Sequence, residues 1–116
     1  MISFTIEAPD AEQRTVPEAV YKVTVARDFE DLIPGFLQNR RTELEGLRAA
    51  IAAGNFEQVS RLGHRMKGVG NSYGFEKITL LGKQFEDSAQ NADRTGIETR
   101  IAEYADFLAH VEVVFE

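Results

Sequence analysis

The sequence predicts an all-α fold: an antiparallel up-down-up-down four-helix bundle with a short extended N-terminal arm. First, apolar residues recur at three- and four-residue spacings through most of the chain after residue 28. Second, turn residues divide this region into four segments joined by short connections, which make successive helices antiparallel neighbours. Third, the beginning of the chain alternates apolar and polar side chains instead. We therefore expect one domain, with the arm over residues 1–27 and the bundle over residues 28–116.

The alternation in the arm occurs in two stretches, residues 1–8 and residues 21–25. Its apolar members are Ile2, Phe4 and Ile6 in the first stretch and Tyr21, Val23 and Val25 in the second. Two short strands that pair with each other would explain the pattern, and so would a terminal arm lying over the bundle. Both interpretations stay open, and neither carries visible chemistry.

The first helical region begins near Asp28, which can cap a turn that runs to Ile33. Pro34-Gly35 should then bend or break the chain, because proline lacks an amide donor and clashes with the preceding turn. A long amphipathic helix follows and stops at Gly54, a natural residue for the left-handed conformation after a helix end. Its apolar face holds Phe36, Leu37, Leu44, Leu47 and Ile51. Its charged residues, expected mostly on the other face, are Arg40, Arg41, Glu43, Glu45 and Arg48.

Asn55 restarts the helix at once, with Gln58 as its capping-box partner. The core stripe of this second helix is Phe56, Val59, Leu62 and Met66. We expect the helix to loosen near residues 70–74, where glycines recur, and a third helix to run from about Phe75 to residues 91–94. The inward residues of the third helix are Ile78, Leu81, Phe85 and Ala89.

A second capping-box signature, Thr95 with Glu98, opens the last helix. The apolar seam of this helix is Ile97, Ile101, Tyr104, Leu108 and Val111. The tail over residues 111–115 is rich in β-branched side chains and should finish as an extended piece.

Composition excludes several classes of function. The 116-residue chain has a net charge of −6 with acidic and basic residues interspersed, so it lacks the basic stripe that nucleic-acid binding needs. It has no cysteine, which excludes disulfides, thiol catalysis and thiolate metal sites. No segment approaches the roughly 20 apolar residues of a membrane span, and we find no signal-peptide core. We expect a monomeric, cytoplasmic protein that binds neither nucleic acid nor membrane.

His64, one of two histidines, lies on the second helix and points roughly 140° away from the mean direction of the core stripe. An exposed histidine is most often an ordinary surface residue, but the neighbours of His64 are unusual. Lys67 places a positive charge one turn along, while Gly68 at i+4 and Ser60 at i−4 leave room on both sides of the ring. This arrangement suits an incoming protein surface that brings an anionic group.

The chemistry that fits an exposed histidine is nucleophilic. A neutral imidazole is a competent nucleophile near neutral pH, because the unperturbed pKa of histidine is about 6.5. Metal binding would need a second ligand close by on the helix, but Gly68 fills the i+4 position and the other histidine, His110, belongs to another helix. We therefore expect neither a metal site nor a bound cofactor.

The run from His64 to Gly70 (His-Arg-Met-Lys-Gly-Val-Gly), followed by Tyr73-Gly74, resembles the signature of the histidine-containing phosphotransfer (HPt) domain. That signature is a histidine, two residues, Lys-Gly, small residues, an aromatic residue and a glycine. Three further stretches resemble the family: Phe36-Leu37 with Leu44 and Leu47, the Ala-Ala-Gly-Asn-Phe sequence before the histidine helix, and Phe85-Glu86. The likeness covers residues 28–111, while Asn71-Ser72 and the arm fall outside what matches.

The resemblance implies a phosphorelay carrier. Such domains accept a phosphoryl group on histidine from the phospho-aspartate of a receiver domain and pass it to another receiver, without a nucleotide site and without phosphorylating themselves. His64 would be the phosphoacceptor, Lys67 would offset charge on the phosphoryl oxygens, and Gly68 would admit the active-site loops of the partner. The implied partners are response-regulator receiver domains, a hybrid histidine kinase, or both, and the Mg²⁺ of the reaction would belong to the receiver.

A nucleophilic Nε2 needs the ring proton on Nδ1, and some group must hold that tautomer. The third helix returns antiparallel past His64, so a residue about twenty positions on can reach the ring. Glu86 is the first candidate, with Gln84 and Lys83 nearby. Alternatively, Glu86 is an ordinary solvated charge.

Other function classes stay open. A helical-bundle adaptor or inhibitor could bind a receiver or a kinase without carrying phosphate, and it would bind and signal unchanged after replacement of His64. An enzyme such as a kinase or phosphatase is disfavoured, because the sequence has no phosphate-cradling glycine loop. For receiver docking we expect a small apolar ring at the edges of the histidine, with contributions from Met66, Val69 and Ile78.

Overall fold

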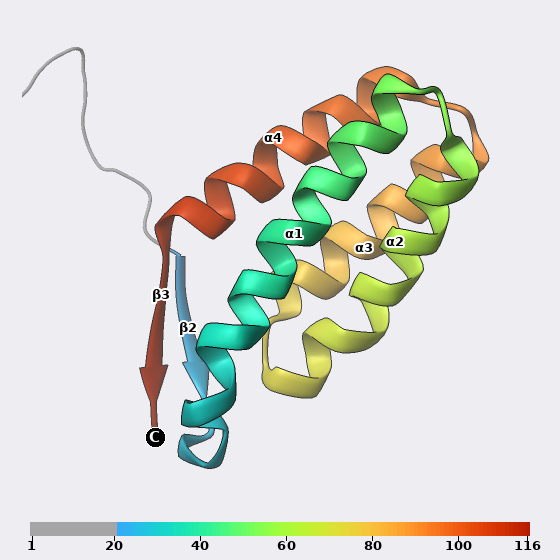
Figure 1. Cartoon of the computed structure of the whole chain (residues 1–116). Helices are drawn as coiled ribbons and strands as arrows, with labels where there is room; N and C mark the ends of the chain where they lie inside the picture. Colours follow the sequence, from blue (N-terminus) through green and yellow to red (C-terminus); the bar gives the residue numbers. More distant parts are fainter. Residues whose placement is uncertain (1–20) are drawn as a thin grey trace, which may run out of the picture.

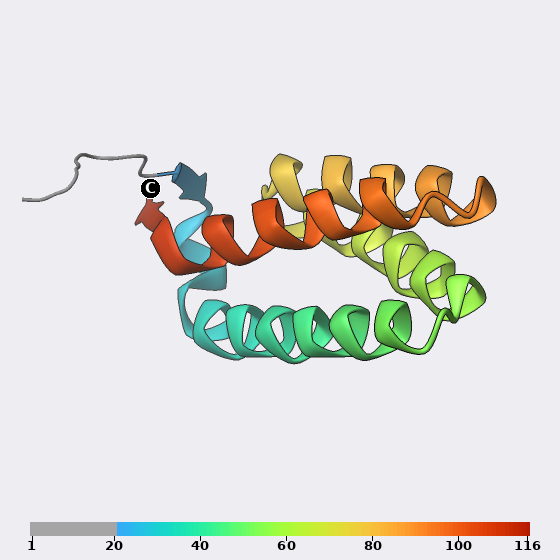
Figure 2. The ribbon, with the colours of Figure 1, turned by 90° about the horizontal axis from the view of Figure 1, so that it is seen from above.

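The structure is a computed structural model that describes residues 21–116. Its four helices are α1 (Ile33–Ala52), α2 (Phe56–Gly70), α3 (Glu76–Gln90) and α4 (Arg94–His110). They run up-down-up-down in chain order (Figure 1), so the predicted bundle is confirmed. The most extensive helix–helix contact joins α2 and α3, whereas α1 and α2 diverge from the loop that connects them (Figure 2). Within these residues, no helix combines the length and the apolar character that crossing a membrane requires.

Two short strands, β2 (Tyr21–Val25) and β3 (Val111–Phe115), complete the fold. They pair in parallel, with Tyr21 opposite Val111 and Val25 opposite Phe115. The predicted extended tail is therefore confirmed, and the second stretch of the arm is a strand. Its partner is the tail from the other end of the chain; the alternating stretch of residues 1–8 lies outside the described residues.

The chain enters α1 through a 3₁₀ helix, Arg27–Leu32, which has no side-chain cap hydrogen bond, so the predicted cap at Asp28 is wrong. Helix α1 begins at Ile33, and Pro34 lies in its first turn. Proline is tolerated there because the first amides of a helix have no acceptor within the helix. Pro34-Gly35 therefore does not interrupt α1. The bend or break predicted there corresponds to the change from 3₁₀ helix to α-helix just before Pro34.

Two charged residues of α1 are buried where the sequence predicted an exposed face: Arg40 is 8% exposed and Glu43 is 6% exposed. Arg40 Nε lies 3.5 Å from Glu43 Oε1, and the Tyr104 hydroxyl donates a hydrogen bond to the same oxygen at 3.0 Å. The helical spacing explains the error. Positions 36, 40, 43 and 47 follow one another by three or four residues, so both charges share the stripe of Phe36 and Leu47.

The connection between α1 and α2 follows the prediction. Gly54 has a φ of 67°, the left-handed conformation that glycine adopts without strain. Asn55 caps α2, because its side-chain oxygen accepts a hydrogen bond from the Gln58 amide at 3.0 Å. The Gln58 side chain does not return to the cap as a capping box would require; it accepts hydrogen bonds from Arg61 instead.

The start of α4 differs from the prediction. The helix begins at Arg94, and its N-cap is Asp93, whose carboxylate accepts a hydrogen bond from the Gly96 amide at 3.0 Å. The capping box predicted at Thr95 and Glu98 is therefore wrong. Both Asp93 and Thr95 are good N-cap residues, so the sequence allowed either start.

Glycines let α2 and α3 pack closely. A Cβ atom at Gly63 would lie 2.6 Å from the carbonyl oxygen of Gly82, and a Cβ atom at Gly82 would lie 2.5 Å from the carbonyl oxygen of Gly63. No side chain fits at either position, so close helix packing explains both glycines. The backbone of α3 therefore runs directly against the segment of α2 that carries His64.

The core consists of the apolar stripes of the helices. Its largest fully buried side chains are Tyr104, Phe75, Phe85, Phe107, Leu47, Met66, Ile78, Leu81, Ile97, Val25 and Val59. Three members of the predicted stripes, Leu37, Phe56 and Val111, are only half-buried. Two of them lie at helix ends, since α2 begins at Phe56 and α4 ends just before Val111. The apolar period thus identified most of the core, and two of these three exceptions lie at helix ends.

Candidate functional site

His64 lies near the middle of α2, on the side of the helix turned away from the core. Its side chain is 73% exposed, in agreement with the direction that the helical period predicts. On the opposite side of the same helix, Val59 and Met66 are fully buried. The ring is therefore accessible to a partner, while the helix that carries it is fixed by the core.

The carboxylate of Glu86, on α3, contacts the His64 ring. Glu86 Oε2 lies 3.0 Å from His64 Nδ1, and the Glu86 side chain is only 15% exposed. Of the three residues considered from the sequence, Glu86 is the one that reaches the ring. Lys83 instead pairs with Asp87, with Nζ 3.4 Å from Oδ2, and no hydrogen bond joins Gln84 to the histidine.

The same carboxylate also binds Lys67. The Lys67 ammonium lies 2.8 Å from Glu86 Oε1, so Glu86 bridges the histidine and the lysine through its two oxygens. The spacing of His64 and Lys67 along α2 predicted that these two side chains are neighbours. The sequence did not predict the bridge between them, because it depends on the register of α3 against α2.

The Glu86 carboxylate fixes the tautomer of the ring. The hydrogen bond from Lys67 lowers the pKa of Glu86 and the hydrogen bond from His64 adds to this effect, although burial acts in the opposite direction. The carboxylate is therefore ionised at neutral pH and can only accept hydrogen bonds. The neutral ring consequently carries its proton on Nδ1, which leaves the lone pair of Nε2 available. Nε2 makes no hydrogen bond with any residue of the described chain, 21–116.

Gly68 leaves the neighbourhood of the ring open. A Cβ atom at this position would meet no atom within 4 Å, in contrast to the crowded positions of Gly63 and Gly82. Gly68 is also exposed, on the same side of α2 as His64. Packing therefore does not explain this glycine, and the space beside the histidine is free for an incoming group.

A shallow hollow of about 490 Å³ surrounds the exposed ring, and we call it the His64 hollow. It is lined by Ser60, Arg61, His64, Arg65 and Glu86. The two arginines were not singled out from the sequence as site residues. Arg61 lies at i−3, on the same side of α2 as the histidine, which was an available signal; Arg65, at i+1, gave none.

The prediction of exposed apolar residues around the histidine is wrong for two of the three residues named. Met66 and Ile78 are both fully buried, because they belong to the core stripes of α2 and α3. Val69 is half-buried. The exposed apolar side chain on α3 is Leu80, which is 51% exposed.

The second histidine is unrelated to this site. His110 lies in the last turn of α4, where its Nδ1 is 2.9 Å from the backbone oxygen of Asp106 and 3.0 Å from its Oδ1. Among residues 21–116, no three His, Asp or Glu side chains gather as a metal ion would require. His110 thus serves as an internal comparison for experiments on His64.

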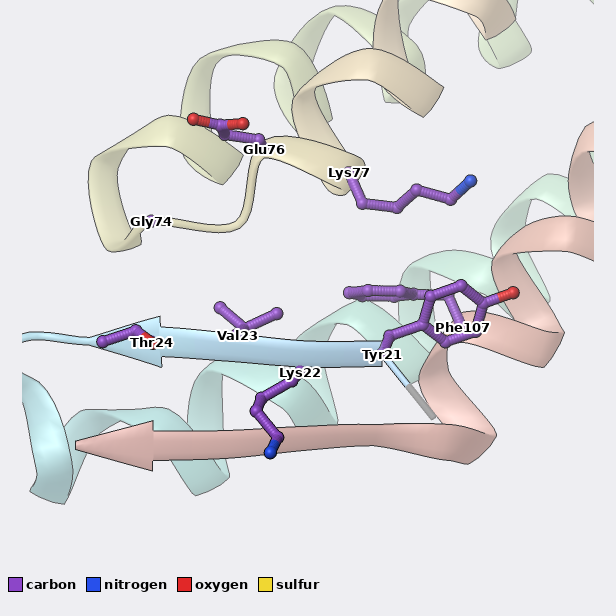
Figure 3. A pocket seen from close by; sticks show the side chains of 8 residues that line it. All are labelled: Tyr21, Lys22, Val23, Thr24, Gly74, Glu76, Lys77 and Phe107. Carbon is purple, nitrogen blue, oxygen red and sulfur yellow. The ribbon is translucent and has the colours of Figure 1, made fainter. Parts of the chain in front are cut away.

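Another hollow, of about 330 Å³, lies between β2 and the start of α3 (Figure 3). It is lined by Tyr21, Lys22, Val23, Thr24, Gly74, Glu76, Lys77 and Phe107. The Tyr21 hydroxyl donates a hydrogen bond to Asp106 at 2.7 Å, and the Lys77 ammonium lies 5.9 Å from the centre of the Tyr21 ring. Figure 3 shows Lys22 and Glu76 pointing away from the space between them. The polar groups of this hollow are engaged within the fold or directed elsewhere, so the His64 hollow is the better candidate site.

Comparison with known proteins adds one match. A scan against protein-family models finds the Hpt domain over residues 31–113, a range that contains all four helices and the His64, Lys67, Gly68 and Glu86 positions. Neither curated proteins nor solved structures give a match.

Proposed function

The chain belongs to the Hpt domain family, whose members carry phosphoryl groups in two-component signalling, and on this premise we propose that His64 is its phosphoacceptor. In this proposal His64 accepts a phosphoryl group from the aspartate of a receiver domain and passes it to another receiver. The partners are response-regulator receiver domains, a hybrid histidine kinase, or both. The chain acts as a carrier and has no kinase activity of its own.

One observation carries the proposal: the contact between His64 Nδ1 and Glu86 Oε2, at 3.0 Å, on a ring that is otherwise exposed. This contact holds the proton on Nδ1 and directs nucleophilic reactivity to Nε2. Gly68 keeps the approach to the ring open, since even a Cβ atom there would meet nothing within 4 Å. The arrangement supports an in-line attack on a phosphoryl group that a partner brings to the surface.

The proposed step exchanges one bond to phosphorus for another. The lone pair of Nε2 attacks the phosphorus of the receiver's aspartyl phosphate, and the P–O bond to the aspartate breaks with its electron pair leaving on the carboxylate. Because Nδ1 keeps its proton, the phosphorylated ring carries a positive charge, which the Glu86 carboxylate offsets. Attack by the aspartate of a second receiver on the phosphorus reverses the exchange and restores the neutral ring.

Lys67 contributes positive charge to the same step. At rest its ammonium binds Glu86, but its side chain is 41% exposed and is held by that one ion pair in the described part of the chain. The flexible stem of lysine lets the ammonium turn toward the anionic oxygens of a phosphoryl group on the neighbouring ring. The Mg²⁺ of the reaction belongs to the receiver in this proposal.

A labelling experiment with both histidine variants tests the proposal. A receiver domain charged with radioactive phosphate is mixed with the native chain, with His64→Gln and with His110→Gln. We expect acid-labile, base-stable label on the native chain and on His110→Gln, and none on His64→Gln. Equal label on His64→Gln would refute the assignment. Native binding to receivers without any label on the chain would favour the adaptor or inhibitor function instead.

A further inference from the structure

Four cationic side chains lie near the candidate phosphoacceptor or its carboxylate: Arg61, Arg65 and Lys67 on α2, and Lys83 on α3. Three of them have a carboxylate partner. Lys67 binds Glu86 at 2.8 Å, Arg61 lies 3.4 Å from Glu57, and Lys83 lies 3.4 Å from Asp87. Arg65 differs from these three, because its side chain makes no ion pair or hydrogen bond with any residue between 21 and 116.

Arg65 lies between two depressions of the surface. It lines the His64 hollow, and it also lines a groove of about 450 Å³ between α1 and α2, the two helices that diverge in Figure 2. The other residues of the groove are Asn39, Arg40, Thr42, Glu43, Gly46 and Leu62. Arg65 is thus exposed on the α1 side of the histidine, whereas Lys67 and Glu86 lie on the α3 side.

The carboxylate of Glu43, which shares the groove with Arg65, does not pair with it. Glu43 belongs to the groove, where burial raises its pKa and the positive charges of Arg40, first, and Arg65, more weakly, oppose that shift. Arg40 is the cation within ion-pair distance of Glu43, at 3.5 Å. Arg65 therefore acts on Glu43 only through space, and its guanidinium keeps all its hydrogen-bonding positions for a group outside the described chain.

Docking of a receiver would remove water from the Arg65 side chain. A partner that brings its phosphoryl group in line with Nε2 must cover the hollow, and Arg65 is adjacent to His64 in that hollow. If the partner covers the Arg65 guanidinium and offers it no carboxylate, the guanidinium loses its hydration without compensation, and this desolvation weakens docking. A partner with a carboxylate at this place avoids the cost and gains a forked, charge-assisted pair.

We propose that Arg65 is a partner-recognition residue, which pairs with an acidic side chain of the docking receiver domain on the α1 side of His64. This inference rests on the proposed phosphoacceptor function, since it names the group that the receiver must present beside the reacting aspartate. Arg65 touches neither the ring nitrogens nor Glu86 through any hydrogen bond or ion pair. It therefore affects docking and not the reactivity of Nε2.

The test compares two phosphodonors. The first is a receiver domain that labels the native chain, and the second is phosphoramidate, a small donor that reacts with histidine without docking. With the receiver, we expect Arg65→Ala to raise the KM for transfer about tenfold with kcat unchanged, and Arg65→Lys to recover part of the loss. With phosphoramidate, we expect Arg65→Ala to be labelled at the native rate.

Arg61→Ala is the matched control, because Arg61 lines the same hollow from the same helix but is already paired with Glu57. It should change the KM by less than about twofold, and salt should weaken transfer to the native chain more than transfer to Arg65→Ala.

A KM for Arg65→Ala equal to that of the native chain overturns the inference about Arg65 but leaves the proposed function intact. Slower labelling of Arg65→Ala by phosphoramidate also overturns it, because Arg65 would then act on the ring. Absence of His64 label with both donors refutes the proposed function instead.

Discussion

At the residue scale, Glu86 joins His64, the proposed phosphoacceptor, and Lys67 in one hydrogen-bonded unit. One oxygen accepts from His64 Nδ1 at 3.0 Å, and the other accepts from the Lys67 ammonium at 2.8 Å. Lysine holds the carboxylate ionised, and the ionised carboxylate in turn holds the ring proton on Nδ1. The lone pair of Nε2 is therefore available before any partner arrives.

Replacing Glu86 should slow phosphoryl transfer while the fold is retained. We expect Glu86→Ala to lower the transfer rate about 10- to 100-fold, because a hydrogen bond to a charged group contributes about 1.5–3 kcal/mol. Glu86→Gln should lose less, since its amide oxygen can still accept from Nδ1. Single-turnover transfer from a charged receiver measures both rates. A native rate in Glu86→Ala would show that the carboxylate does not orient the ring.

The contribution of Glu86 to the free energy of unfolding should depend on pH. The pKa of Glu86 is lowered in the fold, so its ionised form stabilises the native state above about pH 4.3, the unperturbed pKa of glutamate. This contribution is lost as the pH falls through the lower, folded pKa. The difference in unfolding free energy between the native chain and Glu86→Gln should therefore be larger at neutral pH than at about pH 3. Urea unfolding at both pH values measures it, and a constant difference would contradict the shift.

The residue scale also shows what the sequence can and cannot supply. The positions of His64, Lys67 and Gly68 on one side of α2 follow from the helical period alone. The contact with Glu86 was one of several candidates, because the period does not fix how far α3 slides along α2. The buried position of Arg40 follows from its helical spacing, although its charge favours an exposed face.

At the element scale, the glycines of α2 and α3 divide into two kinds. Gly63 and Gly82 allow close packing, since a Cβ atom on either would lie within 2.6 Å of the facing carbonyl oxygen. Gly68 stands in open space. The first kind brings Glu86 to the histidine, and the second kind keeps the approach to the histidine clear.

Alanine at these glycines should therefore have opposite effects. Gly82→Ala should destabilise the fold by about 1–3 kcal/mol, because the added methyl group forces α2 and α3 apart. Gly68→Ala should stabilise it by about 0.5–1 kcal/mol through better helix propensity, yet it should slow transfer from a receiver. Denaturant unfolding and receiver transfer measure the two effects. A Gly68→Ala chain that is phosphorylated by receivers at the native rate would contradict the docking account.

The elements themselves were predictable to different degrees. Long, strongly periodic helices and the Asn55 cap followed from local sequence. The start of α4 did not, because Asp93 and Thr95 are both suitable caps and the neighbouring helices decide between them. A turn before α1 was predicted as well, but its 3₁₀ form and the absence of a side-chain cap were not.

At the scale of the whole molecule, the two-stranded sheet and the candidate site lie on different elements. The β2–β3 sheet ties the end of the arm to the tail, beside the start of α1 and the end of α4 (Figure 1). The candidate site instead lies on α2 and α3. The four-helix architecture was predictable because each helix shows its own period. The parallel pairing of residues 21–25 with 111–115 was not, because it joins segments from opposite ends of the described chain.

The position of phosphorus on the phosphorylated chain tests the central claim most directly. The chain is labelled with ¹⁵N-histidine, charged by a receiver domain and examined by NMR for coupling between phosphorus and a ring nitrogen. We predict a single phosphohistidine, with phosphorus bonded to Nε2 of His64 while Nδ1 keeps its proton. Phosphorus on Nδ1 of His64, or on His110, would contradict the account.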